Sequence, residues 1–189
     1  INKEILEIGP GTGNLTSHIL KKKPKKIYVI EKDNDLSISL ATKFDNEINI
    51  INDDILKISE NKISKNKLTV FGNLPYNIST QVLVKWIKFN ELNKTFKKFI
   101  LMFQKEVAER IVANTNTKNY GRLSILTSWK MNVKKIIDVS PNSFFPAPKV
   151  KSTILLIEPK TNFFKIKNPK NLEHITNVFF NQRRKMIKK

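Results

Sequence analysis

The sequence has 189 residues, of which 40% are hydrophobic, and its 35 lysines and arginines against 16 acidic residues give a formal net charge of +19. The absence of cysteine excludes disulfides, thiolate catalysis, iron–sulfur clusters and cysteine-ligated zinc. The two histidines, His18 and His174, lie far apart in the sequence without a cluster of metal-ligand type, so we predict no metal site.

Strand-like and helix-like segments alternate from the start of the chain. The strand-like segments, rich in β-branched residues, are 4–8, 26–32, 48–52, 68–73, 96–104, 133–140 and 152–159. Apolar residues at helical spacing mark the segments 15–20, 36–44, 78–87, 106–114 and 122–131. This alternation predicts an α/β fold with a mostly parallel sheet and helices on both faces. Such a sheet binds ligands at the carboxyl ends of its strands, where each motif described below lies.

The composition becomes polar and basic from Thr161 onward, and Pro169 interrupts this stretch. Residues 171–189 then predict a helix. Its apolar positions recur at helical spacing and are Leu172, Ile175, Val178 and Phe179. We therefore expect a main α/β domain over residues 1–160 and the start of a small helical domain over residues 161–189.

Both ends of the sequence indicate a fragment of a longer protein. The first residue is Ile1 rather than methionine, and a strand-like stretch follows at once. The last residues, NQRRKMIKK, form a basic helical segment without a stop signal. We expect further sequence before and after them.

A glycine-rich loop separates the first strand from the first helix. The stretch LEIGPGTGNLT contains Gly9, Gly11 and Gly13, and this G-x-G-x-G spacing differs from the dinucleotide fingerprint G-x-G-x-x-G. Glycine allows the backbone to approach a ligand closely. A loop that opens a helix also offers free N–H groups to an anion such as a carboxylate, so we predict such a contact here.

Acidic residues follow the next two strands. Glu31 ends the second strand, at the distance where an acidic side chain reaches ribose hydroxyls in dinucleotide-binding folds. Asp53 and Asp54 follow the third strand, where a carboxylate can accept from an adenine amine. A ribose, an adenine and a carboxylate-bearing tail are parts of S-adenosylmethionine, which we predict as the cofactor. The alternatives are NAD, whose pyrophosphate requires the other glycine spacing, and a loop of turn glycines beside solvated acids.

The fourth strand ends in an uncharged turn, Asn73, Leu74, Pro75 and Tyr76. A donor lying over the first three strands would present its methyl group there. The adenine amine is a poor nucleophile that needs positioning, and the Asn73 side-chain oxygen and the Leu74 carbonyl can accept its two hydrogens. Pro75 stiffens the turn, and Tyr76 offers a face on which a flipped-out base can stack. The alternative is an ordinary strand-to-helix turn.

A second aromatic pair, Phe144 and Phe145, lies on a loop that contains Pro146 and Pro148. One of these rings could enclose the target base from the other side. The alternative is that both rings belong to the core.

Taken together, the motifs resemble those of the small-subunit ribosomal RNA adenine dimethyltransferases. They are LEIGPGTGNLT, VIEKD, NDDIL, FGNLPYNIST, QKEVAERIVA, YGRLSIL, FFPAPKVKST and FFNQRRK, in this order. The resemblance covers nearly the whole chain and implies a class I methyltransferase fold with S-adenosylmethionine as the donor. It also implies the product, two adjacent N6,N6-dimethyladenosines in a hairpin near the 3′ end of small-subunit rRNA.

The resemblance also implies site residues. The implied cofactor contacts are Glu7, Gly9, Gly11, Gly13, Glu31, Lys32, Asp54, Ile55 and Asn73. Among them, Glu31 would hold the ribose, whereas Asp54 and the Ile55 backbone would hold the adenine. The implied catalytic turn is Asn73, Leu74, Pro75 and Tyr76, and the implied base contacts are Tyr76, Phe144 and Phe145, with Phe145 the favoured second ring. The chain lacks the segment that the family carries before the glycine loop, and it ends after the first helix of the helical domain.

Other readings of the motifs remain open. A large-subunit rRNA adenine methyltransferase of the macrolide-resistance type shares the catalytic turn, although QKEVAERI and YGRLS favour the small-subunit branch. A DNA adenine methyltransferase shares the chemistry, but we find no separate base-reading domain. A non-catalytic rRNA-binding assembly factor could keep the fold.

The positive charge favours a polyanionic partner, although a genome rich in A and T also increases the lysine content. The candidate backbone contacts are Arg183, Arg184 and Lys185. A second lysine-rich run, which could be only a solvated face, is Lys21, Lys22, Lys23, Lys25 and Lys26. We expect a monomer that binds rRNA within an immature small ribosomal subunit, without membrane contact, in the bacterial cytoplasm or alternatively in a mitochondrion or plastid.

Overall fold

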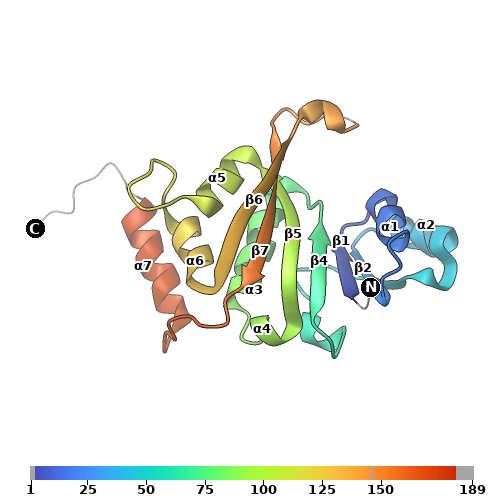
Figure 1. The fold of residues 1–189 in the computed structure, drawn as a ribbon, viewed down its shortest axis with the longest axis horizontal. Coiled ribbons are helices and arrows are strands. Elements are labelled where there is room, and N and C mark those ends of the chain that lie inside the picture. Colours follow the sequence, from blue (N-terminus) through green and yellow to red (C-terminus); the bar gives the residue numbers. More distant parts are fainter. Residues whose placement is uncertain (1–2, 146, 182–189) are drawn as a thin grey trace, which may run out of the picture.

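The computed structural model describes residues 3–145 and 147–181 (Figure 1). The strands are β1 (Glu4–Ile8), β2 (Lys26–Glu31), β3 (Asn49–Asn52), β4 (Leu68–Gly72), β5 (Phe96–Gln104), β6 (Met131–Val139) and β7 (Ser152–Pro159). The α-helices are α1 (Asn14–Leu20), α2 (Asn34–Phe44), α3 (Tyr76–Lys88), α4 (Leu92–Thr95), α5 (Lys105–Val112), α6 (Arg122–Lys130) and α7 (Pro169–Asn181). Short 3₁₀ turns occupy Asp45–Glu47, Glu60–Lys62 and Pro141–Ser143.

All seven strands form one sheet in the order β3-β2-β1-β4-β5-β7-β6. The first five strands are parallel, and β7 runs antiparallel to both of its neighbours. The predicted α/β fold with a mostly parallel sheet is therefore confirmed. Because the chain returns from β3 to pair β4 with β1, the strand order reverses between β1 and β4, and open α/β sheets bind ligands at such a switch point.

Successive residues of each strand point to opposite faces of the sheet, and each face has its own apolar core. On one face, Ile5 and Val29 pack with Leu40 and Phe44 of α2. On the other face, residues of β1, β4 and β5 pack with the apolar side of α3. The α3 residues buried there are Val82, Leu83, Trp86 and Ile87, as the helical spacing predicts. Trp86 and Phe99 lie at the centre, with ring centroids 4.7 Å apart.

The connection from β3 to β4 differs from the other crossovers. Residues 53–67, as the structure describes them, contain a 3₁₀ turn and no α-helix. The apolar residues of this segment, Ile55, Leu56, Ile58 and Ile63, still pack on the core. The segment is therefore held by its side chains rather than by a helix of its own.

Helix α7 begins at Pro169, two residues before the predicted start, and lies at the end of the molecule opposite α1 and α2 (Figure 1). Of its predicted apolar positions, only Leu172 packs on the core. The other three are more than half exposed: Ile175 by 52%, Val178 by 58% and Phe179 by 59%. On the same helix, Glu173 binds Lys88 of α3 at 2.6 Å and Arg122 of α6 at 2.8 Å.

No helix in the described part of the chain is long and apolar enough to cross a membrane.

Candidate functional site

Four loops meet at the carboxyl edge of the parallel strands, which faces the top of Figure 1. The strand register aligns their starting points. Ile8, the last residue of β1, pairs with Ile30 of β2 and with Gly72 of β4. Glu31 of β2 pairs with Asn52 of β3. The glycine loop, the acidic strand ends and the uncharged turn therefore lie along one edge, as the sequence predicts.

The glycines of the first loop fall into two kinds. All three have positive φ angles: +64° at Gly9, +56° at Gly11 and +76° at Gly13. A Cβ atom on Gly9 or Gly11 would meet nothing within 4 Å, whereas one on Gly13 would overlap the Phe44 ring. Gly9 and Gly11 thus border open space that a ligand can fill, and Gly13 permits close packing on α2.

The N–H groups of these glycines are already used within the protein. Gly9 donates to the Ile30 carbonyl at 2.9 Å, and Gly13 donates to the Pro10 carbonyl at 2.9 Å. Gly11 donates to Glu31 Oε2 at 3.2 Å. The expectation that these groups are free for a carboxylate is therefore wrong at the three glycines. The hydrogen bonds instead give the loop a fixed shape.

Glu31 connects the loops that follow β1 and β2. Its side chain is buried, and its Oε1 accepts from the Asp33 N–H at 3.0 Å, while its Oε2 accepts from Gly11. Each carboxylate oxygen has two lone pairs, so both can accept a further hydrogen bond from a hydroxyl group. Asn52 donates to the Glu31 carbonyl at 2.9 Å and so joins the end of β3 to the same place.

Glu7 lies beneath the glycine loop and is 2% exposed. The Thr16 hydroxyl donates to its Oε2 at 2.7 Å, so that α1 is joined to β1. Burial raises the pKa of Glu7 because the charged form loses its hydration. The implied cofactor residue Glu7 thus supports the loop from within the protein.

Asp54 and Lys32 form an ion pair at 3.1 Å. The Leu56 N–H also donates to Asp54 Oδ1 at 2.9 Å. This backbone hydrogen bond, together with the Lys32 ammonium, lowers the pKa of Asp54. Ile55 as a whole residue is 4% exposed, and its carbonyl accepts a hydrogen bond from Lys85 at 2.6 Å.

The uncharged turn presents two acceptors. Asn73 is exposed, and within the described residues no group donates to its side chain or to the Leu74 carbonyl. Leu74 as a whole residue is 2% exposed, and its side chain packs in the core. The carbonyl of Pro75 accepts from the backbone of α3 at its first turn, and the Tyr76 hydroxyl lies 2.6 Å from Ser152 Oγ.

The loop between β6 and β7 projects above the carboxyl edge (Figure 1). The Phe145 side chain on this loop is fully exposed, and Phe144 is half-buried. Neither ring belongs to the two cores, so the core alternative does not hold for Phe145. Pro146 lies outside the described residues, as do the predicted RNA contacts Arg183, Arg184 and Lys185.

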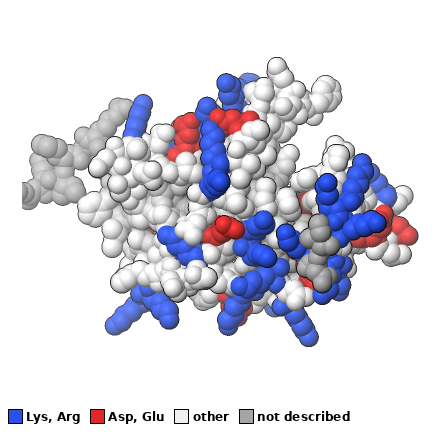
Figure 2. Space-filling view, in the orientation of Figure 1, with Lys and Arg blue, Asp and Glu red and all other residues white. Residues whose placement is uncertain are grey.

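Basic side chains are spread widely over the surface. Figure 2 shows lysine and arginine over several parts of one face, with few acidic groups between them. The lysines of the run from residue 21 to residue 26 are exposed, and among them Lys25 lies 3.8 Å from Glu4.

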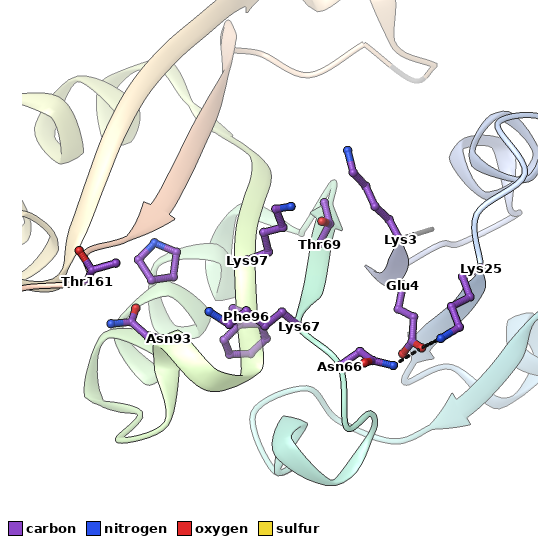
Figure 3. Close-up of a pocket in the computed structure, with 11 residues that line it drawn as sticks. Lys3, Glu4, Lys25, Asn66, Lys67, Thr69, Asn93, Phe96, Lys97 and Thr161 are labelled. Carbon is purple, nitrogen blue, oxygen red and sulfur yellow. Dashed lines mark hydrogen bonds and ion pairs between the residues drawn. The ribbon is translucent and has the colours of Figure 1, made fainter. Parts of the chain in front are cut away.

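A hollow of about 580 Å³ lies at the amino edge of the sheet (Figure 3). Lys25 and Asn66 face Glu4 in it, whereas Lys3 extends away from Glu4. Because Glu4 begins β1 and the glycine loop follows its last residue, this hollow lies at the opposite edge from the four loops. We therefore assign the candidate site to the carboxyl edge.

Four functional neighbours were not predicted from the sequence: Thr16, Asn52, Lys85 and Ser152. Thr16, Asn52 and Ser152 stand within the motifs LEIGPGTGNLT, NDDIL and FFPAPKVKST, and these motifs were the available signal. Lys85 lies in a helix with no motif, and it donates to the Ile55 carbonyl at 2.6 Å.

The comparisons with known proteins agree with this geometry. Residues 2–189 match the family described as "Ribosomal RNA adenine dimethylase". A "Ribosomal RNA small subunit methyltransferase A" of Pelagibacter ubique is 67% identical over 188 residues, which are 100% of this chain and 72% of that protein. The protein of the same name from Ehrlichia ruminantium is 44% identical over 99% of this chain and 71% of its own length.

Solved structures show the same fold. A dimethyladenosine transferase from Plasmodium falciparum is 33% identical and superposes with a TM-score of 0.82, covering 98% of this chain and 66% of that chain. The 23S rRNA methyltransferase ErmE is 23% identical with a TM-score of 0.73, covering 96% of this chain and 71% of that chain, and so supports the fold alone. The predicted class I methyltransferase fold is confirmed. The chain belongs to the ribosomal RNA adenine dimethylase family, whose members are S-adenosylmethionine-dependent methyltransferases.

Proposed function

We propose that this chain methylates the N6 amines of two adjacent adenosines in a 3′-terminal hairpin of small-subunit rRNA, giving N6,N6-dimethyladenosine during ribosome biogenesis. The observation that carries this proposal is a pair of acceptors at the strand end beside the glycine loop, Asn73 and the Leu74 carbonyl, to which none of the described residues donates a hydrogen bond. The names of the 67% and 44% identical relatives support the choice of the small subunit.

The residues at the carboxyl edge fit S-adenosylmethionine. The open space over Gly9 and Gly11 leaves room for the methionine portion close to the backbone. Glu31 would accept from the ribose hydroxyls, and Asp54 with the Ile55 backbone would contact the adenine. Glu7, Gly13 and Lys32 complete the proposed donor site. Glu7 accepts from Thr16 beneath the loop, Gly13 lets the loop pack closely on Phe44, and Lys32 pairs with Asp54. S-adenosylmethionine supplies an electrophilic methyl group on a sulfonium.

The turn after β4 would hold the acceptor amine. Asn73 Oδ1 and the Leu74 carbonyl accept its two hydrogens, which directs the nitrogen lone pair toward the donor. The same oxygens offset the positive charge that develops on nitrogen in the transition state. The methylated amine then releases a proton readily, so the transfer needs no general base. After the first transfer one N–H remains, and one of the two oxygens suffices to hold it.

Two aromatic rings would stack on the flipped-out base. Tyr76 is the first residue of α3, and its hydroxyl is held by Ser152. Phe145 is fully exposed on the loop above the carboxyl edge. Stacking on such rings favours a base that has left its helix, as N6 chemistry requires.

The remaining proposals concern partner and compartment. We propose that the protein acts as a monomer on an immature small subunit in a bacterial cytoplasm, supported by the bacterial source of the relatives. Residues 1–160 would form the catalytic domain, and residues 161–189 would begin an RNA-binding helical domain. Neutralising Arg183, Arg184 and Lys185 should then weaken RNA binding and flatten its salt dependence, and an unchanged salt slope would remove them from the RNA surface.

The test is the transfer of labelled methyl groups from S-adenosylmethionine to unmodified small ribosomal subunits, with the product nucleosides resolved. We expect dimethyladenosine in small-subunit rRNA. Transfer to large-subunit rRNA alone would favour the resistance-type enzyme, and binding of rRNA without transfer would favour an assembly factor.

A further inference from the structure

Lys85 is a largely buried lysine in the middle of α3, with its side chain 22% exposed. Its ammonium donates to the backbone carbonyls of Ile55 and Ile58, both at 2.6 Å, and to Glu60 Oε1 at 2.7 Å. An ammonium has three donors, so these three acceptors use it completely.

Glu60 holds the other side of this contact and is 0% exposed. Its Oε1 also accepts from the Trp86 indole N–H at 2.6 Å. Its Oε2 is buried without a hydrogen-bond partner among the described residues. A buried carboxylate with one oxygen unpartnered costs free energy, so stabilising the fold does not by itself account for the Lys85–Glu60 pair.

The contacts of Lys85 join two parts of the candidate site. Helix α3 begins at Tyr76, in the catalytic turn, and Lys85 lies on the same helix. The segment that it binds starts at the proposed adenine contacts Asp54 and Ile55 and has no α-helix of its own. A cation that binds two carbonyls of an irregular segment fixes the backbone of that segment. A ligand then binds a preformed surface and does not have to order the segment on binding.

We propose that Lys85, oriented by Glu60, is a positioning residue that fixes residues 55–58 for the adenine of the methyl donor. It acts through the backbone at Ile55 and Ile58 and does not touch the donor. This inference rests on the proposed function, because it concerns the same donor site.

The first test is Lys85→Met, with the donor KM and kcat measured on small subunits and the donor Kd measured by equilibrium dialysis. We expect the KM and Kd for the donor to rise about tenfold, the factor that one charge-assisted hydrogen bond supplies, with kcat changed less than about twofold. Lys88→Met is the matched control, because Lys88 lies on the same helix but pairs with Glu173 of α7. It should leave donor affinity unchanged.

A second variant separates positioning from stability. Lys85→Met alone leaves the Glu60 carboxylate buried and unpaired, so it should lower the unfolding temperature. Lys85→Met combined with Glu60→Met removes that charge and should recover stability, while the carbonyls of Ile55 and Ile58 still lack their donor. The donor Kd should therefore stay raised in the double variant. This measurement remains possible even if the single variant fails to fold.

Recovery of the donor Kd together with stability would overturn the proposal, and so would a loss of kcat at unchanged donor KM. If the unaltered protein binds the donor but transfers no methyl group, the proposed function is wrong. The donor Kd values of the unaltered protein and the variants still test the role of Lys85. If the unaltered protein does not bind the donor at all, both are overturned.

Discussion

The hydroxyl groups of Tyr76 and Ser152 lie 2.6 Å apart, although 76 residues separate them in the chain. Ser152 is the first residue of β7 and is fully buried, and it pairs with Gln104 of β5 and Val139 of β6. The ring proposed to stack on the target base is therefore connected to the strand that follows the Phe144–Phe145 loop. The hydrogen bond fixes the tilt of this ring relative to that loop.

Removal of this hydrogen bond should weaken catalysis moderately. We expect Tyr76→Phe to cost about 1 kcal/mol of transition-state stabilisation, because the ring stays and one hydrogen bond is lost. Tyr76→Ala should cost about 1–3 kcal/mol more through the lost stacking. The measurement is kcat/KM on small subunits. Ser152→Ala should reproduce the effect of Tyr76→Phe, and the double variant should be no worse than either single one; additive losses would show that the two hydroxyls act independently.

Asn73→Ala should abolish most of the methyl transfer without loss of RNA binding. Since one oxygen acceptor at the developing charge is removed, we expect kcat to fall by about 10²–10³. The RNA affinity, measured by equilibrium binding, should be retained. Asn77→Ala is the control, because Asn77 is also an exposed asparagine and lies four residues later, at the second position of α3. If Asn73→Ala keeps full activity, the acceptor arrangement proposed here is incorrect.

The two kinds of glycine in the first loop should respond differently to alanine. Gly13→Ala places a Cβ against the Phe44 ring at a positive φ, so we expect a stability loss above the roughly 1–2 kcal/mol of left-handed strain. Gly11→Ala carries similar strain but no clash, so it should lose less stability and more donor affinity. Chemical denaturation and equilibrium dialysis on both variants check this. Equal stability losses would contradict the packing at Gly13.

The contributions of Glu7 and Glu4 to the free energy of unfolding should change with pH in opposite directions, although both residues are buried in β1. Burial raises the pKa of Glu7 from 4.5, so its contribution to stability is present below pH 4.5 and is lost as pH rises through its folded pKa. Burial also acts on Glu4, but hydrogen bonds from Ser64 and Asn66, with the nearby Lys25 and Lys26, lower its pKa from 4.5. Its contribution is therefore present above pH 4.5 and is lost as pH falls.

Urea denaturation of Glu7→Gln and Glu4→Gln at a series of pH values between 4 and 7 tests this difference. Relative to the unaltered protein, Glu7→Gln should gain stability as pH rises, and Glu4→Gln should lose it. The same sign for both variants would show that burial, rather than the partners of each carboxylate, decides the dependence.

Local patterns in the sequence predicted the strands, the helices other than α4, and the loops that form the site. The apolar spacing from Ile78 to Ile87 predicts α3 because a helix buries residues three and four apart. The glycine loop, Glu31, Asp54 and the turn at Asn73 each follow a recognisable strand. Parallel strands bring their carboxyl ends to one edge, so the site could be assembled without knowledge of the strand order.

Tertiary structure alone decided the contacts between these loops, because they depend on register and helix rotation, which couple residues far apart in the chain. The Gly11 N–H is taken by Glu31 only because β1 and β2 are neighbours in register. Helix α7 leaves Ile175, Val178 and Phe179 exposed, while its Glu173 binds cations on α3 and α6. No feature of the sequence distinguishes Lys85 from the other lysines. The packing of α3 against residues 55–60 brings its ammonium to the carbonyls of Ile55 and Ile58 and to Glu60.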